Sequence, residues 1–310
     1  MNKQTTVTFA ALAAACFAGS SAFAGTPVRV SKQPKEVLQE SCITGNIGLN
    51  VTSNYIRQGI VQENQGLILQ PYADLHFRIY QGSGPINSIV ADIGIWNSIH
   101  DNNRVGRPGR VGTPNWFEFD FTAGLTFNID KLALSPYFRT YESPAGRFRN
   151  TYVIGTRISY DDSDLLGAFA LHPYVRAELN LEGSTGNSQP GNLANGQYYE
   201  VGVAPAHSYG DLTLSLPVTA GFGSGGFYLG NRGFGFIAVG LDASYALNFV
   251  PACLGKWSVN SGVTYYYLNG RNNTVASRSG AAGFGPAFTP GNGLADNNQL
   301  VFSGGLKVAF

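Results

Sequence analysis

Ionisable side chains recur at every second position in several stretches of this sequence. Asp74, His76 and Arg78 form one such series, and Glu118 with Asp120 begins another. Because successive side chains of a β-strand point to opposite faces of a sheet, each series falls on a single face. The set that this parity places on one common face comprises Asp74, His76, Arg78, Asp92, Glu118, Asp120, Arg139, Arg157, Arg176, Glu178, Glu200, Asp242 and Lys307.

The charges on this face are ordered along the chain. Asp92, Glu118 and Asp120 lie on two neighbouring predicted strands, and each of the next three predicted strands carries an arginine instead. If the face lines a water-filled lumen, this separation produces a transverse field that selects polar or charged solutes. The alternative is that a narrow lumen brings the same groups together as ion pairs that plug it.

The residue pattern gives little support to catalysis. The parity points His76 and His172 into the lumen, where they serve as polar lining. A hydrolase of membrane lipids needs a serine beside a histidine on the outward face, and no predicted strand offers that pair. Neither Cys42 nor Cys253 has a metal ligand at a suitable spacing. We therefore predict no catalytic, cofactor or metal site.

The apolar side of the same segments indicates how the charges are positioned. From residue 67 to 80 the odd positions are almost wholly apolar and the even ones mostly polar, and the alternation recurs at 116–128 and 168–181. Strands of soluble domains usually run about 5 to 6 residues, whereas a tilted strand that crosses a membrane needs roughly 9 to 11. The longer segments here predict membrane-spanning strands with an apolar outer face and a polar lumen.

Twelve strands are predicted from this alternation. They lie near residues 45–58, 66–80, 86–99, 116–128, 131–142, 149–160, 166–182, 197–207, 211–222, 232–248, 256–269 and 297–310. Short connections alternate with long ones, as periplasmic turns and extracellular loops do, and an even count returns both termini to the periplasmic side. Because an open sheet edge finds no water to bond in lipid, the strands must close. We expect an all-β fold, a closed antiparallel up-and-down transmembrane β-barrel over residues 44–310.

The N-terminus has the features of an export signal. Lys3 precedes an apolar stretch at 7–18, and Ala22-Phe23-Ala24 matches the small-x-small pattern of signal peptidase. We predict a cleaved signal peptide at 1–24, a periplasmic segment at 25–43, and a barrel in the bacterial outer membrane. No later apolar run approaches the roughly 20 residues of a membrane-spanning helix. Loss of Lys3 from a net charge of +1 leaves a chain near neutrality, which gives no indication of nucleic-acid binding.

The last strand ends in an aromatic residue. Residues 300–310 alternate apolar with small or polar side chains and finish at Phe310. This pattern resembles the C-terminal strand that the barrel assembly machinery recognises in outer-membrane proteins. Phe310 is therefore a predicted assembly signal.

Two cysteines remain after removal of the signal. Cys42 precedes the first predicted strand, and Cys253 lies in the turn before the eleventh. Export places both in an oxidising compartment, and barrel closure brings the two regions to the same rim. We predict a disulfide between them.

Arginines are concentrated in one long predicted loop. Arg104, Arg107 and Arg110 are separated by glycines and a proline. They could form a collar that grips lipopolysaccharide phosphates or recruits acidic solutes; the alternative is an ordinary solvated loop.

The stretch from Asn46 to Gln62 resembles the first strand of the TorF-like porin family, also called Gcw_chp. That family opens with Ser-Asp-Tyr, then Arg-Gly and a Gln three residues later, whereas here Asn54 replaces the aspartate and Arg57 lies one place early. The resemblance is strongest over residues 44–100. It implies an outer-membrane barrel presumed to be a pore, and identifies no substrate.

Together these patterns predict a porin-like barrel, embedded in outer-membrane lipid, for passive diffusion of small hydrophilic solutes. The alternative is a non-conducting structural or adhesive barrel that acts through its extracellular loops.

Overall fold

Antiparallel strands account for nearly all the regular structure of this chain. The computed structural model describes residues 41–64, 66–101, 115–146, 150–182, 196–224, 227–228, 233–269 and 297–310. The wall strands are β1 (Ile43–Thr52), β4 (Ile68–Gln81), β5 (Ile86–His100), β6 (Trp116–Ile129), β7 (Leu132–Glu142), β8 (Thr151–Tyr160), β9 (Tyr174–Glu182), β10 (Gln197–Val203), β11 (Ala206–Tyr209), β12 (Leu212–Ser215), β13 (Val218–Ser224), β14 (Phe234–Ala246), β15 (Lys256–Leu268) and β16 (Asn298–Ala309). The short elements are β2 (Tyr55–Arg57), β3 (Ile60–Glu63), helix α1 (Ser163–Leu166) and the 3-10 turns η2 (Gly167–Phe169) and η3 (Ala252–Leu254). No helix in these described ranges is long and apolar enough to cross a membrane.

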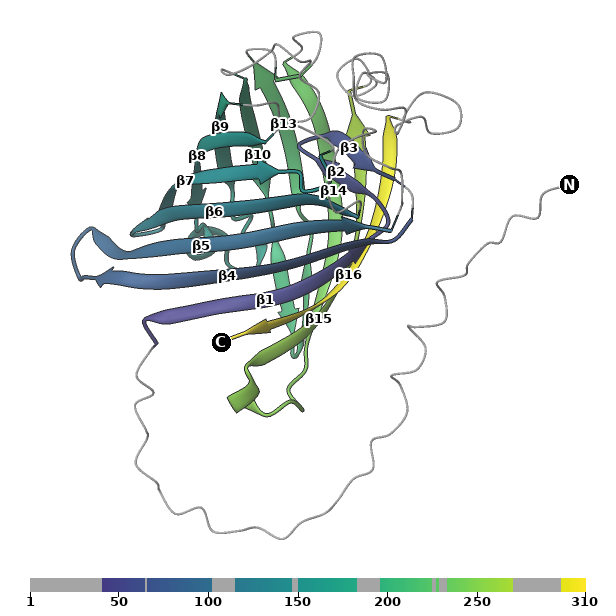
Figure 1. Cartoon of the computed structure of the whole chain (residues 1–310). Coiled ribbons are helices and arrows are strands. Elements are labelled where there is room, and N and C mark those ends of the chain that lie inside the picture. Colours follow the sequence, from purple (N-terminus) through teal and green to yellow (C-terminus); the bar gives the residue numbers. More distant parts are fainter. Residues whose placement is uncertain are drawn as a thin grey trace, which may run out of the picture. The chain divides into compact units, whose positions relative to one another are not determined.

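The wall closes on itself (Figure 1). β1 pairs with β4 on one side and β16 on the other, and β14 pairs with β15 to complete the ring. β10 and β11 are halves of one wall strand, as are β12 and β13, and Pro205 and Pro217 lie at the two interruptions. Proline removes a ladder donor, which weakens strand pairing at both breaks. Counted in this way, the described ranges form a closed barrel of twelve antiparallel strands, which confirms the predicted fold.

The two faces of the wall differ in polarity. Leu75 on β4 and its cross-strand partner Ile93 on β5 are both exposed, whereas Asp74 lines an interior cavity. The same parity puts large apolar side chains on the exterior around the ring. This is the arrangement that a barrel in lipid requires.

Interior glycines lie beneath tyrosine rings of neighbouring strands. Gly155 pairs with Tyr137, and a Cβ added to it would lie 2.5 Å from the ring. Gly48 pairs with Tyr72 in the same way, at 2.4 Å. A glycine therefore lets a large ring lie along the wall, and this accounts for part of the high glycine content.

The first wall strand is shorter than predicted. β1 ends at Thr52, whose hydroxyl donates to the Asn54 carbonyl oxygen at 2.8 Å, and the chain leaves the wall there. Residues 55–63, partly assigned to the wall from sequence, form the separate hairpin β2–β3.

The segment between β8 and β9 also differs from the prediction. Residues 163–169 form α1 and η2 rather than the start of a strand, and β9 begins only at Tyr174. The Asp162 carboxylate accepts hydrogen bonds from the backbone N–H groups of Leu171 and His172, which closes this segment into a compact turn. His172, predicted to point into the lumen, lies instead in the turn with a φ of 48°.

Candidate functional site

The hairpin β2–β3 is built around a two-residue turn. Arg57 pairs with Ile60, and the intervening Gln58 and Gly59 have φ values of 51° and 78°. Two consecutive residues with positive φ make the kind of tight turn that matches the twist of a hairpin. Gly59 is also sterically required, because an added Cβ would lie 2.4 Å from Phe236 Cδ1 of the wall.

Polar contacts fasten the hairpin to the interior of the wall. The Arg57 guanidinium forms an ion pair with Glu118 on β6, and the Tyr55 hydroxyl donates to the same carboxylate at 2.9 Å. The Gln58 side-chain amide donates to Glu178 on β9 at 2.6 Å. The hairpin therefore contacts carboxylates on two separate parts of the ring.

Apolar contacts close the space on the other side of the hairpin. Ile60 is buried in a cluster that includes Tyr198, Phe236 and Leu268 of the wall. The segment between β13 and β14 adds Tyr228, whose hydroxyl donates to the Gln58 carbonyl oxygen at 2.8 Å. The hairpin thus packs inside the barrel rather than standing above it.

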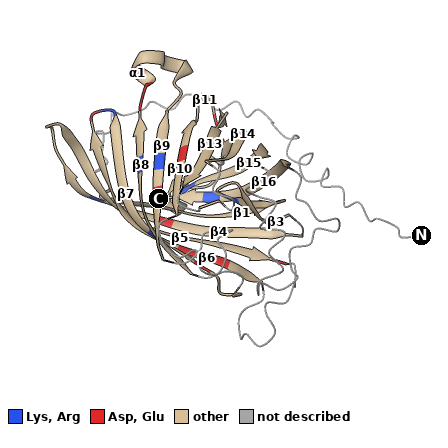
Figure 2. Ribbon diagram, turned by 90° about the horizontal axis from the view of Figure 1, so that it is seen from above, with Lys and Arg blue, Asp and Glu red and all other residues tan. Residues whose placement is uncertain are grey.

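Charged wall residues near the hairpin are also paired. Arg176 lies 2.9 Å from Glu178 and 3.8 Å from Glu200, and Arg139 lies 3.9 Å from Glu178. In Figure 2 acidic residues are visible on β5, β6 and β10, with a basic one on β9. Near the hairpin these charged groups form local ion pairs, as the second of the two alternatives expects, and Arg57 of the hairpin faces the acidic strand β6.

A cavity of about 560 Å³ lies beside the hairpin. Its lining includes five of the residues selected from sequence: Asp74, Asp120, Arg139, Arg176 and Glu200. A second cavity of about 520 Å³ is lined by Asp242 and Lys307, and it shares Tyr55, Tyr72 and Trp96 with the first. The two cavities therefore adjoin along one flank of the hairpin.

The other selected residues lie elsewhere on the wall. His76 Nδ1 is 2.7 Å from Asp92, which also accepts a hydrogen bond from Thr126. The Arg157 guanidinium lies 3.7 Å from the centroid of the Tyr174 ring, and Arg78 donates to the Ser41 carbonyl oxygen at 3.1 Å. Among the described residues, none of these contacts involves the hairpin.

Phe310 completes the seam of the barrel. Its backbone N–H donates to the Gly45 carbonyl oxygen at 3.0 Å, and its carbonyl oxygen accepts from the Gly45 N–H at 2.9 Å. The last residue is thus held by the first wall strand, while its role in assembly stays a prediction.

The predicted disulfide is not formed, since Cys42 and Cys253 are free, exposed thiols. β16 lies between the strands that follow them, because Asn46 of β1 and Lys256 of β15 both pair with Ala309. Two strand spacings amount to roughly 10 Å. Bridged Cα atoms lie within about 7 Å of each other, so the intervening strand keeps the two cysteines apart.

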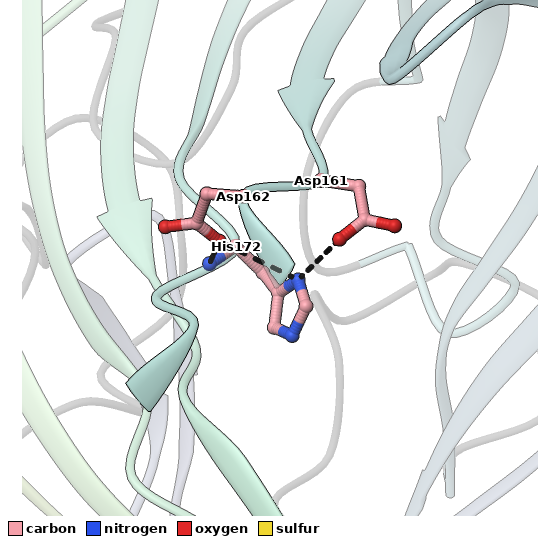
Figure 3. Close-up of side chains that lie close together, drawn as sticks. All are labelled: Asp161, Asp162 and His172. Atoms are coloured by element: carbon pink, nitrogen blue, oxygen red, sulfur yellow. Dashed lines mark hydrogen bonds and ion pairs between the residues drawn. The ribbon is translucent and has the colours of Figure 1, made fainter. Parts of the chain in front are cut away.

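Asp161, Asp162 and His172 form a compact group in the turn before β9 (Figure 3). His172 Nδ1 is 3.7 Å from Asp161 and 3.9 Å from Asp162. Burial acts in the opposite direction, but backbone N–H groups of His172 and Leu171 hold the pKa of Asp162 below its ordinary value. Hydrogen bonds from Ser163 likewise lower the pKa of Asp161. Because the oxygens of Asp162 already accept backbone hydrogen bonds, we assign this group to the stability of the turn.

Sequence reasoning missed the hairpin residues Tyr55, Arg57 and Gln58. The available signal was the Gln58-Gly59 dipeptide between two short alternating segments, which is typical of a tight turn. Four features lie outside the described residues: the predicted signal peptide at 1–24, residues 25–40 of the N-terminal segment, the arginines of loop 102–114, and the long loop at 271–296.

Comparison with known proteins gives likeness at the level of architecture. The sequence matches no protein-family profile and no curated protein, so the TorF-like resemblance is not confirmed. Among solved structures, an outer-membrane channel from Pseudomonas putida F1 is 10% identical, with 90% of this chain and 100% of that one covered and a TM-score of 0.47. The NanC porin is 10% identical over 84% and 98% of the two chains, with a TM-score of 0.44. Outer membrane phospholipase A from Escherichia coli is 13% identical over 86% and 92%, with a TM-score of 0.38. Both channels and an enzyme occur among these weakly similar structures, and the closed β-barrel of this chain is established by its own strand pairing.

Proposed function

We propose that this chain is an outer-membrane channel through which small hydrophilic solutes diffuse, and that the β2–β3 hairpin sets the width of its lumen. The observation that carries the proposal is the pair of adjoining polar cavities inside a closed barrel with an apolar exterior. Cavities of this size accommodate ligands up to about the size of a drug molecule. A signal peptide at 1–24 would deliver the chain, and the assembly machinery, through Phe310, would insert it beside lipopolysaccharide.

The second candidate is a barrel that does not conduct. It is favoured by the pairing of Arg57 with Glu118, whose side chains are 6% and 0% exposed, and by the buried cluster around Ile60. Both features fill the interior around the hairpin. Under this alternative the loops would provide the function by contacting partners.

Catalysis is the weaker choice for the described residues. A hydrolase acting on membrane lipid would need a serine and a histidine together on the outer surface. The Ser98 hydroxyl lies 2.8 Å from His100 Nε2, but both residues are buried, at 0% and 4% exposure. This pair is therefore closed off from lipid.

Swelling of liposomes that contain the refolded mature chain tests the channel proposal. Small polyols and amino acids should enter and swell the vesicles, while oligosaccharides too large for the cavities should not. If vesicles that contain the folded protein swell in none of these solutes, the result would support the non-conducting alternative and contradict the channel.

A further inference from the structure

The surroundings of the 560 Å³ cavity hold more carboxyl groups than guanidinium groups. We count, among the described residues, the charged groups that line the cavity or form an ion pair with a lining residue. The carboxylates are Asp74, Glu118, Asp120, Glu178 and Glu200, and the cations are Arg57, Arg139 and Arg176. Each arginine already faces a carboxylate, so the cavity has no uncommitted cation.

Two carboxylates at the cavity lack a cation of their own. Neither Asp74 nor Asp120 forms an ion pair with any described residue. Asp120 is only 9% exposed, and its Oδ1 atom has no hydrogen-bond partner. A buried carboxylate oxygen is costly to leave without a donor, so this atom favours a ligand that supplies one.

A second acceptor lies on the hairpin side of the same cavity. Gln58 Oε1 is buried without a partner, while the amide nitrogen of that side chain is bound to Glu178. Donor atoms without a partner are present at the cavity as well, Arg176 Nε among them, but the charge of this guanidinium is balanced by Glu178 and Glu200. Carboxyl groups therefore outnumber guanidinium groups at the site, and two of its oxygen acceptors, on Gln58 and Asp120, are unmatched.

Aromatic rings complete the lining. Tyr55 and Trp96 lie with their centroids 5.3 Å apart, and Tyr72, Phe236 and Tyr266 also contribute to the cavity. Faces of aromatic rings attract cations, and an ammonium group carries three N–H donors that suit oxygen acceptors. Carboxylate, amide oxygen and ring faces together form the surroundings that an alkylammonium ion requires.

We propose that this cavity binds small organic cations with a primary ammonium group, seated against Asp120 and the rings of Tyr55 and Trp96. The inference rests on the proposed function in one respect, that bound cations enter through the lumen. It specifies the class of solute that the channel holds during passage.

A set of five-carbon probes that differ only in their end groups tests the binding site. Equilibrium dialysis of radiolabelled cadaverine against the detergent-folded mature chain should give saturable binding. Unlabelled 5-aminopentanoate should compete weakly, and glutarate and 1,5-pentanediol should not compete. Equal competition by all three unlabelled compounds, or no saturable binding of cadaverine, would overturn the proposal without the need for any variant.

Replacement of Asp120 locates the site within the lumen. Asp120→Asn should weaken cadaverine binding by about tenfold or more, since a charge-assisted hydrogen bond to a carboxylate becomes a weaker one to a neutral amide oxygen. Asp242→Asn makes the same change of charge at a lumen residue that lines the second cavity and not the first, and it should leave affinity within about twofold. Equal weakening by both variants would mean that the overall lumen charge, and not this site, attracts the cation.

Potassium conductance in planar bilayers separates this inference from the proposed function. Cadaverine should reduce the conductance of the open channel, and Asp120→Asn should relieve the block. Conductance steps that cadaverine leaves unchanged, together with absent binding, would overturn the cation site and leave the channel intact. Saturable binding in a barrel that never conducts would support the site and overturn the channel.

Discussion

The Arg57 guanidinium meets the Glu118 carboxylate inside the barrel, and neither side chain has appreciable contact with solvent. Arg57 comes from the hairpin and Glu118 from β6, which are 61 residues apart in sequence. Tyr55 donates a hydrogen bond to the same carboxylate. Because one buried charge left without the other is unfavourable, the pair strongly favours the hairpin in its docked position.

Breaking this pair from either side should destabilise the barrel. We expect Arg57→Ala or Glu118→Ala to lower the free energy of unfolding by about 3 to 5 kcal/mol, because the remaining charge stays buried. The double variant Arg57→Met with Glu118→Leu should recover much of that loss. Urea unfolding in lipid vesicles measures these values, with Lys131→Ala, which breaks an exposed ion pair with Asp164, as a control expected to change little. Single variants as stable as the parent would show that the pair does not hold the hairpin.

A methyl group at Gly59 should displace the hairpin from the wall. The φ of 78° and the Phe236 ring both oppose a side chain there, whereas an added Cβ at Gly84, in the turn between β4 and β5, meets nothing within 4 Å. We expect Gly59→Ala to expose the bond after Arg57 to trypsin, and Gly84→Ala to leave it protected. Mass spectrometry of timed digests detects the cut, and equal protection in the two variants would contradict the docked turn.

The sequence predicts those strands in which apolar and polar side chains alternate. Long strands such as β4 and β6 have one apolar and one polar face, so their positions, their number and their closure follow from the sequence. Alternation does not distinguish a strand that continues along the wall from one that turns inward, so Arg57 and Glu118 could not be paired beforehand. Their contact depends on the turn at Gly59 and on packing between distant segments. A turn was predicted after residue 160, but its extension to residue 173 was not, since the Asp162 carboxylate there accepts backbone hydrogen bonds in place of strand pairing.

The pairing of interior glycines with tyrosines should be detectable as a difference between two glycine sites. An added Cβ at Gly155 would collide with the Tyr137 ring, whose hydroxyl donates to Glu178 at 2.7 Å. At Gly304 the added atom would meet only the Asn260 carbonyl oxygen, at 3.7 Å. We expect Gly155→Ala to reduce stability in the same vesicle assay by about 1 to 3 kcal/mol through overpacking, with Gly304→Ala close to the parent. Similar values for both would mean that ring placement is not constrained.

Acid should loosen the turn before β9. Since folding lowers the pKa of Asp162, its stabilising effect is complete above the ordinary value of 3.8 and is lost as the pH falls through the lowered folded value. Hydrogen exchange at the Leu171 and His172 amides, corrected for intrinsic rates, should show protection at neutral pH that fades as the pH falls below the ordinary carboxyl pKa of 3.8. Asp162→Asn should lose part of this protection already at neutral pH, while Asp164→Asn, in the same turn, should keep it. A pattern independent of pH would exclude the carboxylate as the cause.

The central claim is that the hairpin occupies the path of solutes through the barrel. Thr52 and Ile68 are direct cross-strand partners, so residues 53–67 can be replaced by a two-residue Asn-Gly turn that joins β1 to β4. Both proteins should fold, as judged by heat-sensitive migration in gels, and single-channel conductance in planar bilayers should then compare them. We predict small conductance steps for the parent and conductance steps several-fold larger for the shortened chain. Equal conductance in the two folded proteins would contradict a hairpin that narrows the lumen.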